Sequence, residues 1–242
     1  MTKILCFDPF SGIAGDMTLS ALVDLGADPA KIEKILNQLG LKSKLNLEFK
    51  QVIKKGVQGL HFSLAKPWPS LGHQSVKSLS AKILGANFSP FVQETSLKIL
   101  DQVAIAEAKI HGVEKEKVHF HEVGAIDSLV DVIGVAIALE DLGMPKLYST
   151  PPALGLGSVD CSHGKYPIPA PASLEILKGL PIRESNEAFE LTTPTGAAIL
   201  KGLCEIIPSL PSMTIDKIGY GAGTFELENQ PNILRAILGR LA

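Results

Sequence analysis

The stretch Lys3–Gly26, "KILCFDPFSGIAGDMTLSALVDLG", indicates the fold class. Its first six residues have the composition of a buried strand, and Pro9 with the turn "SGIAGD" ends that strand. The following "DMTLSALVDLG" has the apolar spacing of a helix that stops at Gly26. We therefore expect a strand, a loop and a helix, the succession from which α/β proteins are built.

Further helix and strand signals follow in residues 28–112. Asp28 with Pro29 predicts the start of one helix, and Ser89 with Pro90 predicts the start of another that ends at Gly112. Residues 45–65 alternate around "KKGVQG", which predicts a β-hairpin, and residues 75–85 predict a third helix. We expect Lys66–Gln74, "KPWPSLGHQ", to be a loop. The helix over 89–112 should pack against a sheet through a set of apolar residues on one face: Ile99, Val103, Ala106 and Ile110.

From Lys146 onward the sequence favours short strands and turns. Pro171 and the pair Thr193–Pro194 predict two short helices, and residues 213–239 predict two strands joined by the Gly-rich turn "GYGAGT". The expected fold is α/β or α+β: a mixed sheet covered by helices, with a smaller strand- and turn-rich C-terminal part. We treat residues 1–242 as one domain, with a possible subdivision into 1–145 and 146–242.

Composition excludes some classes of function. With 23 Lys and Arg against 25 Asp and Glu, the net charge of −2 favours neither nucleic acid nor an anionic membrane as partner. No window approaches the ~20 apolar residues of a membrane span, and the N-terminal apolar run is too short for a signal peptide. Three separated cysteines indicate structural thiols. A cytoplasmic protein that binds a small molecule or a protein partner is expected.

The densest polar motif is Val118–Gly134, "VHFHEVGAIDSLVDVIG". If its start is extended, His119 and His121 share one face, and their imidazoles suit Ni, Zn, Cu or Fe. Asp127 and Asp131 lie one helical turn apart in an otherwise apolar run, so a cation, a histidine or a backbone donor should face them. In the alternative interpretation, Asp127 caps the helix, Asp131 bonds a neighbouring loop, and the histidines are polar residues of a partly exposed strand.

The loop after the first strand is a second candidate, "FDPFSGIAGDM". A carboxylate at a strand end followed by a Gly-containing loop and a helix is where α/β proteins bind ligands. Backbone amides from Ser11 through Gly12 to Gly15 would hold a phosphate, and Asp8 and Asp16 would bind a divalent cation beside it. The alternative is an ordinary tight turn with Asp16 as the helix N-cap.

Two helix starts form a third candidate. "CSHGKYPIPAPAS" carries His163 and Lys165, and "TTPTGAA" offers hydroxyls of Thr193 and Thr195 with the amides of a helix start at Gly196. Both suit an anionic group. The alternative is that Pro and Thr only cap short helices, as tight-hairpin glycines would explain "GYGAGT".

The motifs "DPFSGIAGDM", "VHFHEVGAIDSLVD", "HGKYPIPAPA", "LTTPTGAA" and "IGYGAGT", in this order from Ile4 to about Leu238, resemble the LarC family of nickel insertion proteins. The resemblance implies a lyase-class chelatase that inserts nickel into pyridinium-3,5-bisthiocarboxylic acid mononucleotide, forming two S–Ni bonds and one C–Ni bond. It also implies CTP hydrolysis with Mn or Mg. The product would be the cofactor of lactate racemase-type enzymes, whose apo form would be a partner.

The chain departs from the family pattern in two places. Where relatives carry a histidine-rich loop, this sequence has "KPWPSLGHQ" with His73 alone. The family also continues into a C-terminal domain associated with CTP binding and oligomer formation, whereas this chain stops at Ala242. We expect that domain to be a partner, encoded separately or in a shifted reading frame, and we expect a possible homo-oligomer.

The resemblance and the motifs together assign expected roles. His119, His121 and Glu122 would face nickel; a carboxylate group would bind a divalent cation or accept the ring proton; and a third group would hold phosphate. The carboxylate group is Asp8, Asp16, Asp127 and Asp131, and the phosphate group is Ser11, Gly12, Gly15, His163, Lys165, Thr193, Thr195 and Gly196. Two alternatives are a metal-dependent phosphohydrolase and a non-catalytic module that binds nickel or the precursor.

Overall fold

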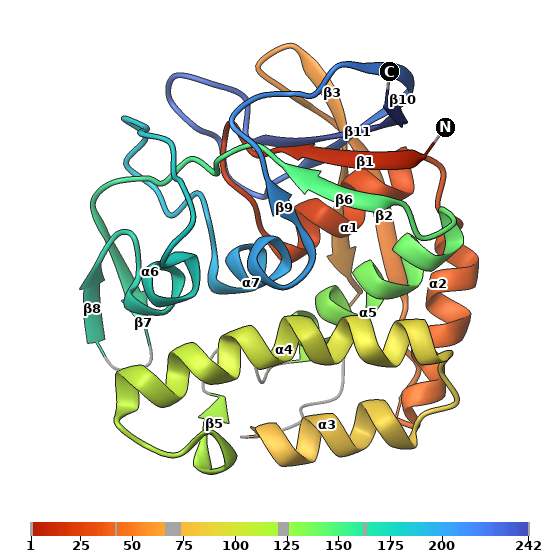
Figure 1. Ribbon diagram of the computed structural model, residues 1–242, viewed down its shortest axis with the longest axis vertical. Coiled ribbons are helices and arrows are strands. Elements are labelled where there is room, and N and C mark those ends of the chain that lie inside the picture. The colour runs from red at the N-terminus through yellow and green to blue at the C-terminus, as the bar shows by residue number, and fades with distance from the viewer. Residues whose placement is uncertain (1, 42, 66–73, 121–125, 162–163, 242) are drawn as a thin grey trace.

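A computed structural model describes residues 2–41, 43–65, 74–120, 126–161 and 164–241 of the chain. Within them a mixed sheet has the strand order β2-β3-β10-β11-β1-β6-β9 (Figure 1). β6 pairs parallel with β1 and β9 parallel with β6, whereas β11 pairs antiparallel with both β1 and β10. The strands are β1 (Lys3–Asp8), β2 (Leu47–Lys54), β3 (Val57–Leu64), β6 (Lys146–Ser149), β9 (Glu205–Ile206), β10 (Met213–Ala222) and β11 (Ile233–Leu241). The expected α/β class with a mixed sheet is confirmed, and both 1–145 and 146–242 contribute strands to it.

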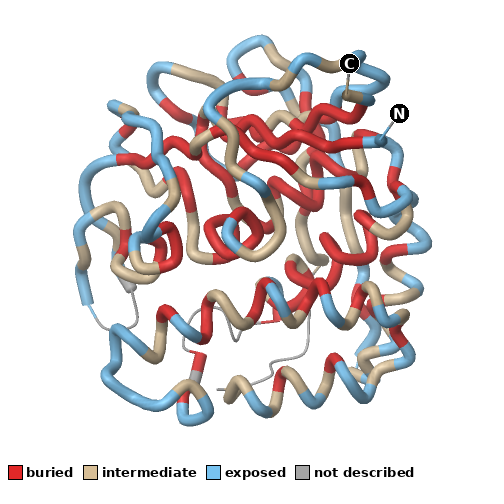
Figure 2. The backbone as a smooth tube through the Cα atoms, in the orientation of Figure 1, coloured by how far each residue is buried: buried red, intermediate tan, exposed pale blue. Residues whose placement is uncertain are grey.

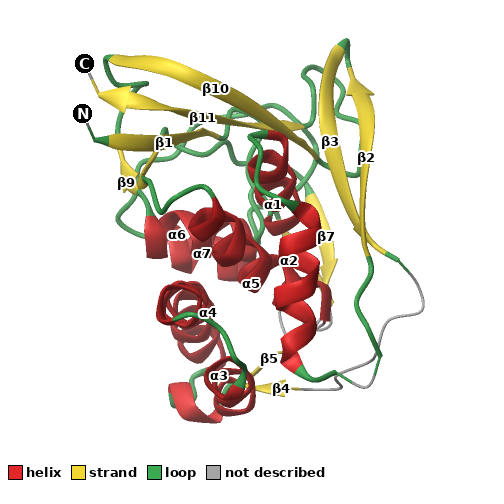
Figure 3. Ribbon diagram, turned by 90° about the vertical axis from the view of Figure 1, so that its right-hand side faces the viewer, coloured by secondary structure: helices red, strands yellow, loops and turns green. Residues whose placement is uncertain are grey.

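Helices cover one face of this sheet in two successive layers (Figure 3). α1 packs on β3, β10 and β11, and α5, α6 and α7 lie between the sheet and α4, with α3 beyond α4. The helices are α1 (Gly15–Asp24), α2 (Pro29–Leu36), α3 (Val76–Gly85), α4 (Pro90–His111), α5 (Ile126–Asp141), α6 (Pro171–Leu177) and α7 (Pro194–Leu203), with 3-10 turns η1 (Asn37–Leu39) and η2 (Lys115–Lys117). Two small sheets pair β4 (Gln74–Ser75) with β5 (His119–Phe120) and β7 (Ser158–Cys161) with β8 (Gly164–Pro167).

The predicted helix starts are confirmed by their capping contacts. The side chains of Asp28, Ser89 and Thr193 accept backbone N–H groups at the first turns of α2, α4 and α7, each with proline at the start of the helix. Gly112 ends α4 in the left-handed conformation, with φ of 64°. Local sequence chemistry is therefore sufficient to place these boundaries.

The prediction that α4 packs against a sheet was wrong. α4 packs against α5, α6 and α7 on one side and α3 on the other. Its Ile99, Val103 and Ala106 are buried, but Ile110 is 40% exposed near the helix end. Apolar periodicity indicates that a helix face is covered, and it carries no information on whether a sheet or other helices cover it.

The prediction that "GYGAGT" is a tight turn was also wrong. Gly219 and Gly221 lie inside β10, and the connection to β11 follows as residues 223–232. A Cβ on Gly219 would lie 2.3 Å from the Ala21 carbonyl oxygen, and one on Gly221 would lie 1.9 Å from that of Met17. The alternate glycines therefore allow the backbone of α1 to lie directly on the strand.

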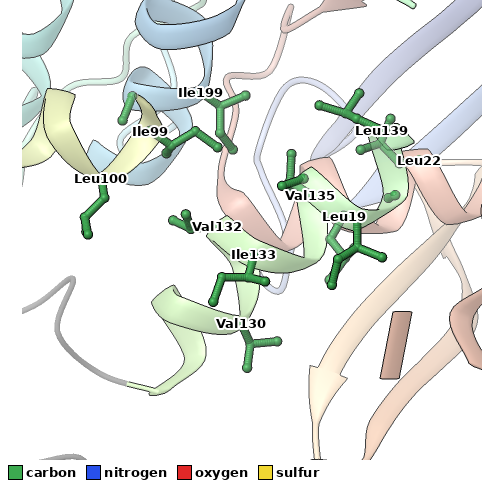
Figure 4. Close-up of a cluster of buried hydrophobic side chains, with 14 of the residues drawn as sticks. Leu19, Leu22, Ile99, Leu100, Val130, Val132, Ile133, Val135, Leu139 and Ile199 are labelled. Atoms are coloured by element: carbon green, nitrogen blue, oxygen red, sulfur yellow. The ribbon is translucent and has the colours of Figure 1, made fainter. Parts of the chain in front are cut away.

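α5 occupies the centre of the core. Figure 4 shows Leu19 and Leu22 of α1 on one side of this helix and Ile99 of α4 with Ile199 of α7 on another. The buried stretch of α5 is continuous from Leu129 to Leu139 except for Asp131, which is half-buried, and Figure 2 shows the buried backbone concentrated in the sheet and the adjacent helices. A carboxylate therefore lies at the edge of the most apolar helix of the molecule.

The expected loop Lys66–Gln74 lies outside the described residues except for Gln74. That residue belongs to β4, where it pairs with Phe120, so the prediction that Gln74 is a loop residue was wrong. No helix in the part of the chain that the structure describes has the length and apolarity to cross a membrane.

Candidate functional site

α1 and α5 begin side by side because a glycine lets them approach. An added Cβ on Gly15, the first residue of α1, would lie 2.5 Å from Asp131 Oδ2 and 2.6 Å from Asp131 Cβ. No larger residue fits between this helix start and Asp131, which lies on the second turn of α5. The carboxylate of Asp131 is therefore held against the N-terminal turn of α1, where backbone N–H groups favour negative charge.

Three carboxylates gather at this junction, and we call Asp16, Asp127 and Asp131 the acidic cluster. Asp16 is half-buried and accepts the backbone N–H of Met17 at 2.7 Å. Asp127 is exposed and accepts the N–H of Ser128 at 2.9 Å. Asp131 Oδ1 is buried and has no hydrogen-bond partner among the described residues. The predicted one-turn spacing of Asp127 and Asp131 is confirmed, because both lie on α5.

Burial and mutual repulsion disfavour the ionised form of two members of the cluster. Burial raises the pKa of Asp131 well above its usual value, and the negative charges of Asp16 and Asp127 raise it further. Burial also raises the pKa of Asp16, opposed mainly by the backbone N–H of Met17 and then by the charge of His61. Carboxyl groups with raised pKa values are suited to accept and release a proton near neutral pH.

The acidic cluster fits a divalent cation in chemistry but does not by itself form a metal centre. Carboxylate oxygens are the donors that Mg²⁺ and Mn²⁺ prefer, and the unpartnered Asp131 Oδ1 has capacity for one more contact. Among the described residues, however, no three His, Cys, Asp or Glu side chains are grouped closely enough to hold a metal ion. A cation at this junction would need donors from a bound substrate or from elsewhere.

Asp8, a second predicted acid, has a different environment. It ends β1 and is 6% exposed, with Oδ2 at 2.5 Å from Arg235 Nη2 and Oδ1 accepting the Thr150 hydroxyl at 2.8 Å. Arg235 also lies over the ring of Phe10, 5.9 Å from its centroid. Both carboxylate oxygens of Asp8 are therefore engaged within the fold, and its predicted role towards a cation or proton is untested.

The loop after β1 and the start of α7 were predicted separately as phosphate sites, and the structure packs them together. Ile13 bridges to Thr192, and its carbonyl oxygen accepts the N–H of Thr193 at 3.1 Å. A Cβ on Gly196 would lie 2.0 Å from the same carbonyl oxygen, and one on Gly12 would lie 2.1 Å from that of Leu191. These two glycines thus permit close backbone packing between the segments.

Several polar groups of this junction already have partners. The Ser11 hydroxyl donates to the Pro231 carbonyl, and the Gly12 N–H donates to the Pro9 carbonyl. Thr193 Oγ1 accepts the N–H of Gly196 at 3.2 Å, and Thr195 is buried at 7% exposure. The roles of these residues in phosphate binding stay predictions.

The remaining predicted residues are only partly described. His119 lies in β5 opposite Ser75, which confirms the extended backbone at Val118–Phe120, but its side chain is outside the description. His121, Glu122 and His163 lie outside the described residues altogether. Lys165 is exposed on the β7–β8 hairpin, in a sheet separate from that of β1.

Two residues near these sites were missed from sequence. His61 interrupts the apolar run of β3, and Arg235 is the one charged residue in "NILRAILG". A charged or titratable side chain inside an apolar strand needs a partner, so each was a detectable signal. For Arg235 the partner is Asp8, and for His61 it is the Ala222 carbonyl, 3.1 Å from Nδ1.

The fold and these contacts define a class: a mixed sheet covered by helices, with an acidic, incompletely paired site where two helices begin. Residues 5–241 match the family model described as nickel insertion protein, and the chain belongs to that family.

Similar proteins span the whole of this chain. It is 46% identical over 246 residues to a pyridinium-3,5-bisthiocarboxylic acid mononucleotide nickel insertion protein of Geobacillus kaustophilus, which covers 98% of this chain and 60% of that protein. A protein of the same description from Staphylococcus epidermidis is 48% identical over 237 residues, covering 98% of this chain and 59% of that protein. A putative nickel insertion protein of Geotalea daltonii is 43% identical over 241 residues, covering 99% and 62%.

The chain thus spans about three fifths of the length of these curated relatives. No solved structure matches it. The family membership predicted from the five motifs is confirmed.

Proposed function

We propose that this chain forms the part of a nickel insertion protein that brings nickel to pyridinium-3,5-bisthiocarboxylic acid mononucleotide. The observation that carries the proposal is the family match over residues 5–241, together with two relatives, 46% and 48% identical, that are described as nickel insertion proteins for this mononucleotide. Nickel and the mononucleotide are both substrates here. The reaction class would be that of a lyase-type chelatase acting in the cytoplasm.

The site residues divide into three roles under this proposal. His119, His121 and Glu122 supply imidazole and carboxylate donors to nickel, because imidazole suits this metal. They precede α5 directly in the sequence, so the stretch that carries them leads into the acidic cluster at Asp127 and Asp131. The nickel ligands and the carboxylates of the acidic cluster would then act on the same bound mononucleotide.

The acidic cluster accepts the proton that metallation releases. Forming a C–Ni bond replaces a ring C–H bond, so the carbon keeps the bonding electron pair and a proton leaves for a base. Asp16 and Asp131 suit this step because burial raises the pKa of each carboxyl group, which makes each carboxylate a stronger base than an exposed one. Asp8 would need to give up its contacts with Arg235 or Thr150 to take part.

The phosphate group of the mononucleotide would be held by the third set of predicted residues. Lys165 is exposed and free to supply charge from the β7–β8 hairpin, with His163 beside it in sequence. The segment Ser11–Gly15 and the α7 start at Thr193, Thr195 and Gly196 lie against one another, so a ligand at one would lie near the other. Gly12 and Gly196 keep these two backbones close.

CTP hydrolysis with Mn or Mg belongs to the proposal as a property of the longer protein. About two fifths of the length of each of these curated relatives lies outside the match, and we propose that this part is a C-terminal domain, the partner that binds CTP and forms homo-oligomers. The apo form of a lactate racemase-type enzyme would receive the product.

The test is nickel-dependent activation of an apo racemase by this chain with the C-terminal partner supplied. Replacing both His119 and His121 by Ala should abolish activation, whereas His111→Ala, a change on α4 where the ring contacts Glu107, should leave it intact. Unchanged activation in the double variant would contradict the assignment of nickel ligands. Phosphate release from nucleotides without the precursor would point instead to a phosphohydrolase.

A further inference from the structure

Two phenyl rings from separate loops pack together, and we call Phe189 and Phe225 the aromatic pair. Their centroids lie 4.5 Å apart, with an angle of 46° between the ring planes. Phe189 is half-buried against an apolar cluster, whereas Phe225 is 55% exposed and is the one exposed aromatic residue in the part of the chain that the structure describes. The ring contact between Phe49 and Phe62, by comparison, belongs to the hydrophobic core. Phe225 therefore presents part of its ring to solvent.

A buried lysine fixes the loop at Phe225. Lys54 of β2 is 7% exposed, and its ammonium group donates to the carbonyl oxygens of Thr224 and Phe225 at 3.2 and 3.3 Å. It also pairs with Glu226 Oε1 at 2.6 Å. Burying an ammonium group costs free energy unless its donors have partners, and these partners all lie in residues 224–226. The charge of Lys54 is therefore used to hold the backbone that carries the exposed ring.

A buried carboxylate ties this loop to the loop of Phe189. Glu187, two residues before Phe189, is 3% exposed and accepts the backbone N–H groups of Glu228 and Asn229 at 2.9 and 2.7 Å. Two buried charged side chains, one from β2 and one from the Phe189 loop, thus hold the segment that carries Phe225. A ring held in this way is preorganised, because a ligand that stacks on it does not have to order the loop first.

The aromatic pair and the proposed phosphate segment share the same supports. The Ser11 hydroxyl donates to the Pro231 carbonyl at 2.7 Å, and a Cβ on Gly12 would lie 2.1 Å from the carbonyl oxygen of Leu191. Pro231 belongs to the connection 223–232, which carries one ring, and Leu191 lies two residues after the other ring. Both loops of the aromatic pair therefore contact the segment that follows β1.

We propose that the aromatic pair captures the mononucleotide by its pyridinium ring, which stacks on the exposed ring of Phe225. The inference rests on the proposed function and extends it with a ring-binding site that the sequence motifs did not include. A pyridinium ring is flat and positively charged, and the face of a phenyl ring carries the negative part of its quadrupole, so the two attract each other when stacked. The phenyl ring offers no hydrogen bond, so the site recognises the flat cationic ring itself.

A purely structural role, in which Phe225 only packs on Phe189, predicts a different response to substitution. Phe225→Leu keeps an apolar side chain beside Phe189 and removes the aromatic face, whereas Phe225→Tyr keeps that face. A packing role makes the two variants differ in stability alone, and a ring-binding role makes them differ in affinity for a pyridinium compound. The matched control is Phe49→Leu, which removes a ring from the contact with Phe62 on β3.

The experiment titrates two probes into the 242-residue chain by calorimetry. Nicotinic acid mononucleotide has a pyridinium ring, and ribose 5-phosphate has no ring of this kind; the native chain should bind the first more tightly. Phe225→Leu should weaken the binding of nicotinic acid mononucleotide about tenfold and leave that of ribose 5-phosphate unchanged, while Phe225→Tyr and Phe49→Leu keep the native affinities. Native affinity in Phe225→Leu, or equal binding of the two probes by the native chain, would overturn the inference.

If Phe225→Leu unfolds at a lower temperature than the native chain, NMR of native protein labelled in its phenylalanine rings decides. Nicotinic acid mononucleotide should shift the Phe225 ring resonances, and ribose 5-phosphate should not. Unaffected resonances overturn the inference.

A parallel insertion assay separates the two proposals. If the native chain with its partner inserts nickel and Phe225→Leu binds nicotinic acid mononucleotide with native affinity, only the inference on the aromatic pair fails. If the native chain with its partner performs no insertion, the proposed function fails whatever Phe225 binds.

Discussion

Asp8 and Asp131 look alike in the sequence and differ in the fold. Each is a carboxylate within a largely apolar element: Asp8 is the last residue of β1, and Asp131 lies on the second turn of α5. Asp8 has an arginine on one oxygen and a threonine hydroxyl on the other. Among the described residues, Asp131 has a buried oxygen without a partner, and the charges of the carboxylates Asp16 and Asp127 raise its pKa.

The two carboxylates differ in their contribution to the stability of the fold: Asp8 stabilises it, and Asp131 destabilises it. A buried carboxylate with charged and hydroxyl donors contributes to stability, whereas one facing other carboxylates costs free energy. Costs of this kind are concentrated at functional sites, where activity needs an unsatisfied group. The comparison therefore favours the Asp131 end of the molecule as the reactive one. Four predictions test this comparison, from the largest expected effect to the smallest.

Gly15→Ala should be the most damaging change, because its Cβ would overlap Asp131 at 2.5 Å from Oδ2. We expect a loss of roughly 3 kcal/mol in the free energy of unfolding, the upper range for overpacking. Urea denaturation measures it. The control is Gly85→Ala at the end of α3, where an added Cβ meets nothing within 4 Å. Equal effects of the two substitutions would contradict the close approach of α1 and Asp131.

Asp8→Asn should cost about 2 kcal/mol, because it removes a charge-assisted hydrogen bond from Arg235 in a largely buried setting. The matched control is Asp216→Asn. Asp216 lies on an exposed part of β10 and pairs with Arg240 of β11, so losing this carboxylate should cost about 0.5 kcal/mol or less. Chemical denaturation of both variants gives the comparison. A cost at Asp8 no larger than at Asp216 would remove the structural role assigned to Asp8.

Asp131→Asn should raise the free energy of unfolding at pH 8 by on the order of 1 kcal/mol, because it removes a carboxylate whose ionised form is disfavoured. The pKa of Asp131 is raised in the folded state, so the native chain binds this proton more tightly when folded. Its contribution to stability is fully present below the unfolded pKa and is lost as pH rises through the folded pKa.

The advantage of Asp131→Asn should therefore shrink as the pH falls towards 4. Thermal unfolding of both chains between pH 4 and 8 measures it, and nickel insertion should be lost in the same variant. A variant that is less stable than the native chain at pH 8 would count against an unsatisfied Asp131.

Asp141→Asn, at the other end of α5, should have the smallest effect of the four. It should lower the free energy of unfolding, whereas Asp131→Asn raises it. Hydrogen bonding to Lys31 and to the backbone N–H of Asp28 lowers the pKa of Asp141. Its stabilising contribution is present above the unfolded pKa and lost as pH falls through the folded pKa. We expect a cost of about 0.5 kcal/mol at pH 7, since Lys31 is exposed. The same pH series checks it; increased stability at pH 7 would contradict the prediction.

Much of the local structure followed from sequence because its signals are local. Asp28, Ser89 and Thr193 cap helices through N–H groups two or three residues away, so their roles are readable without tertiary contacts. The one-turn spacing of Asp127 and Asp131 follows from helical geometry alone. Family membership followed in the same way, from five motifs read in order along the chain.

Contacts between distant residues decided the rest. Periodicity in α4 predicted a covered face, but long-range packing placed helices on it in place of a sheet. Glycines in "GYGAGT" resemble a turn until α1 is seen lying on Gly219 and Gly221. His61 was missed because its partner, Ala222, is 161 residues away.

The sequence by itself determined the capped helix starts of this protein and its family, because caps and motifs act between neighbours in the chain. Only the tertiary structure decided which carboxylates are neutralised. Asp8 binds Arg235, which is 227 residues away in the sequence, whereas Asp131 lies near the carboxylate of Asp16 at the start of α1. The free energy of a charge depends on the groups that surround it in space, and the sequence alone does not show them.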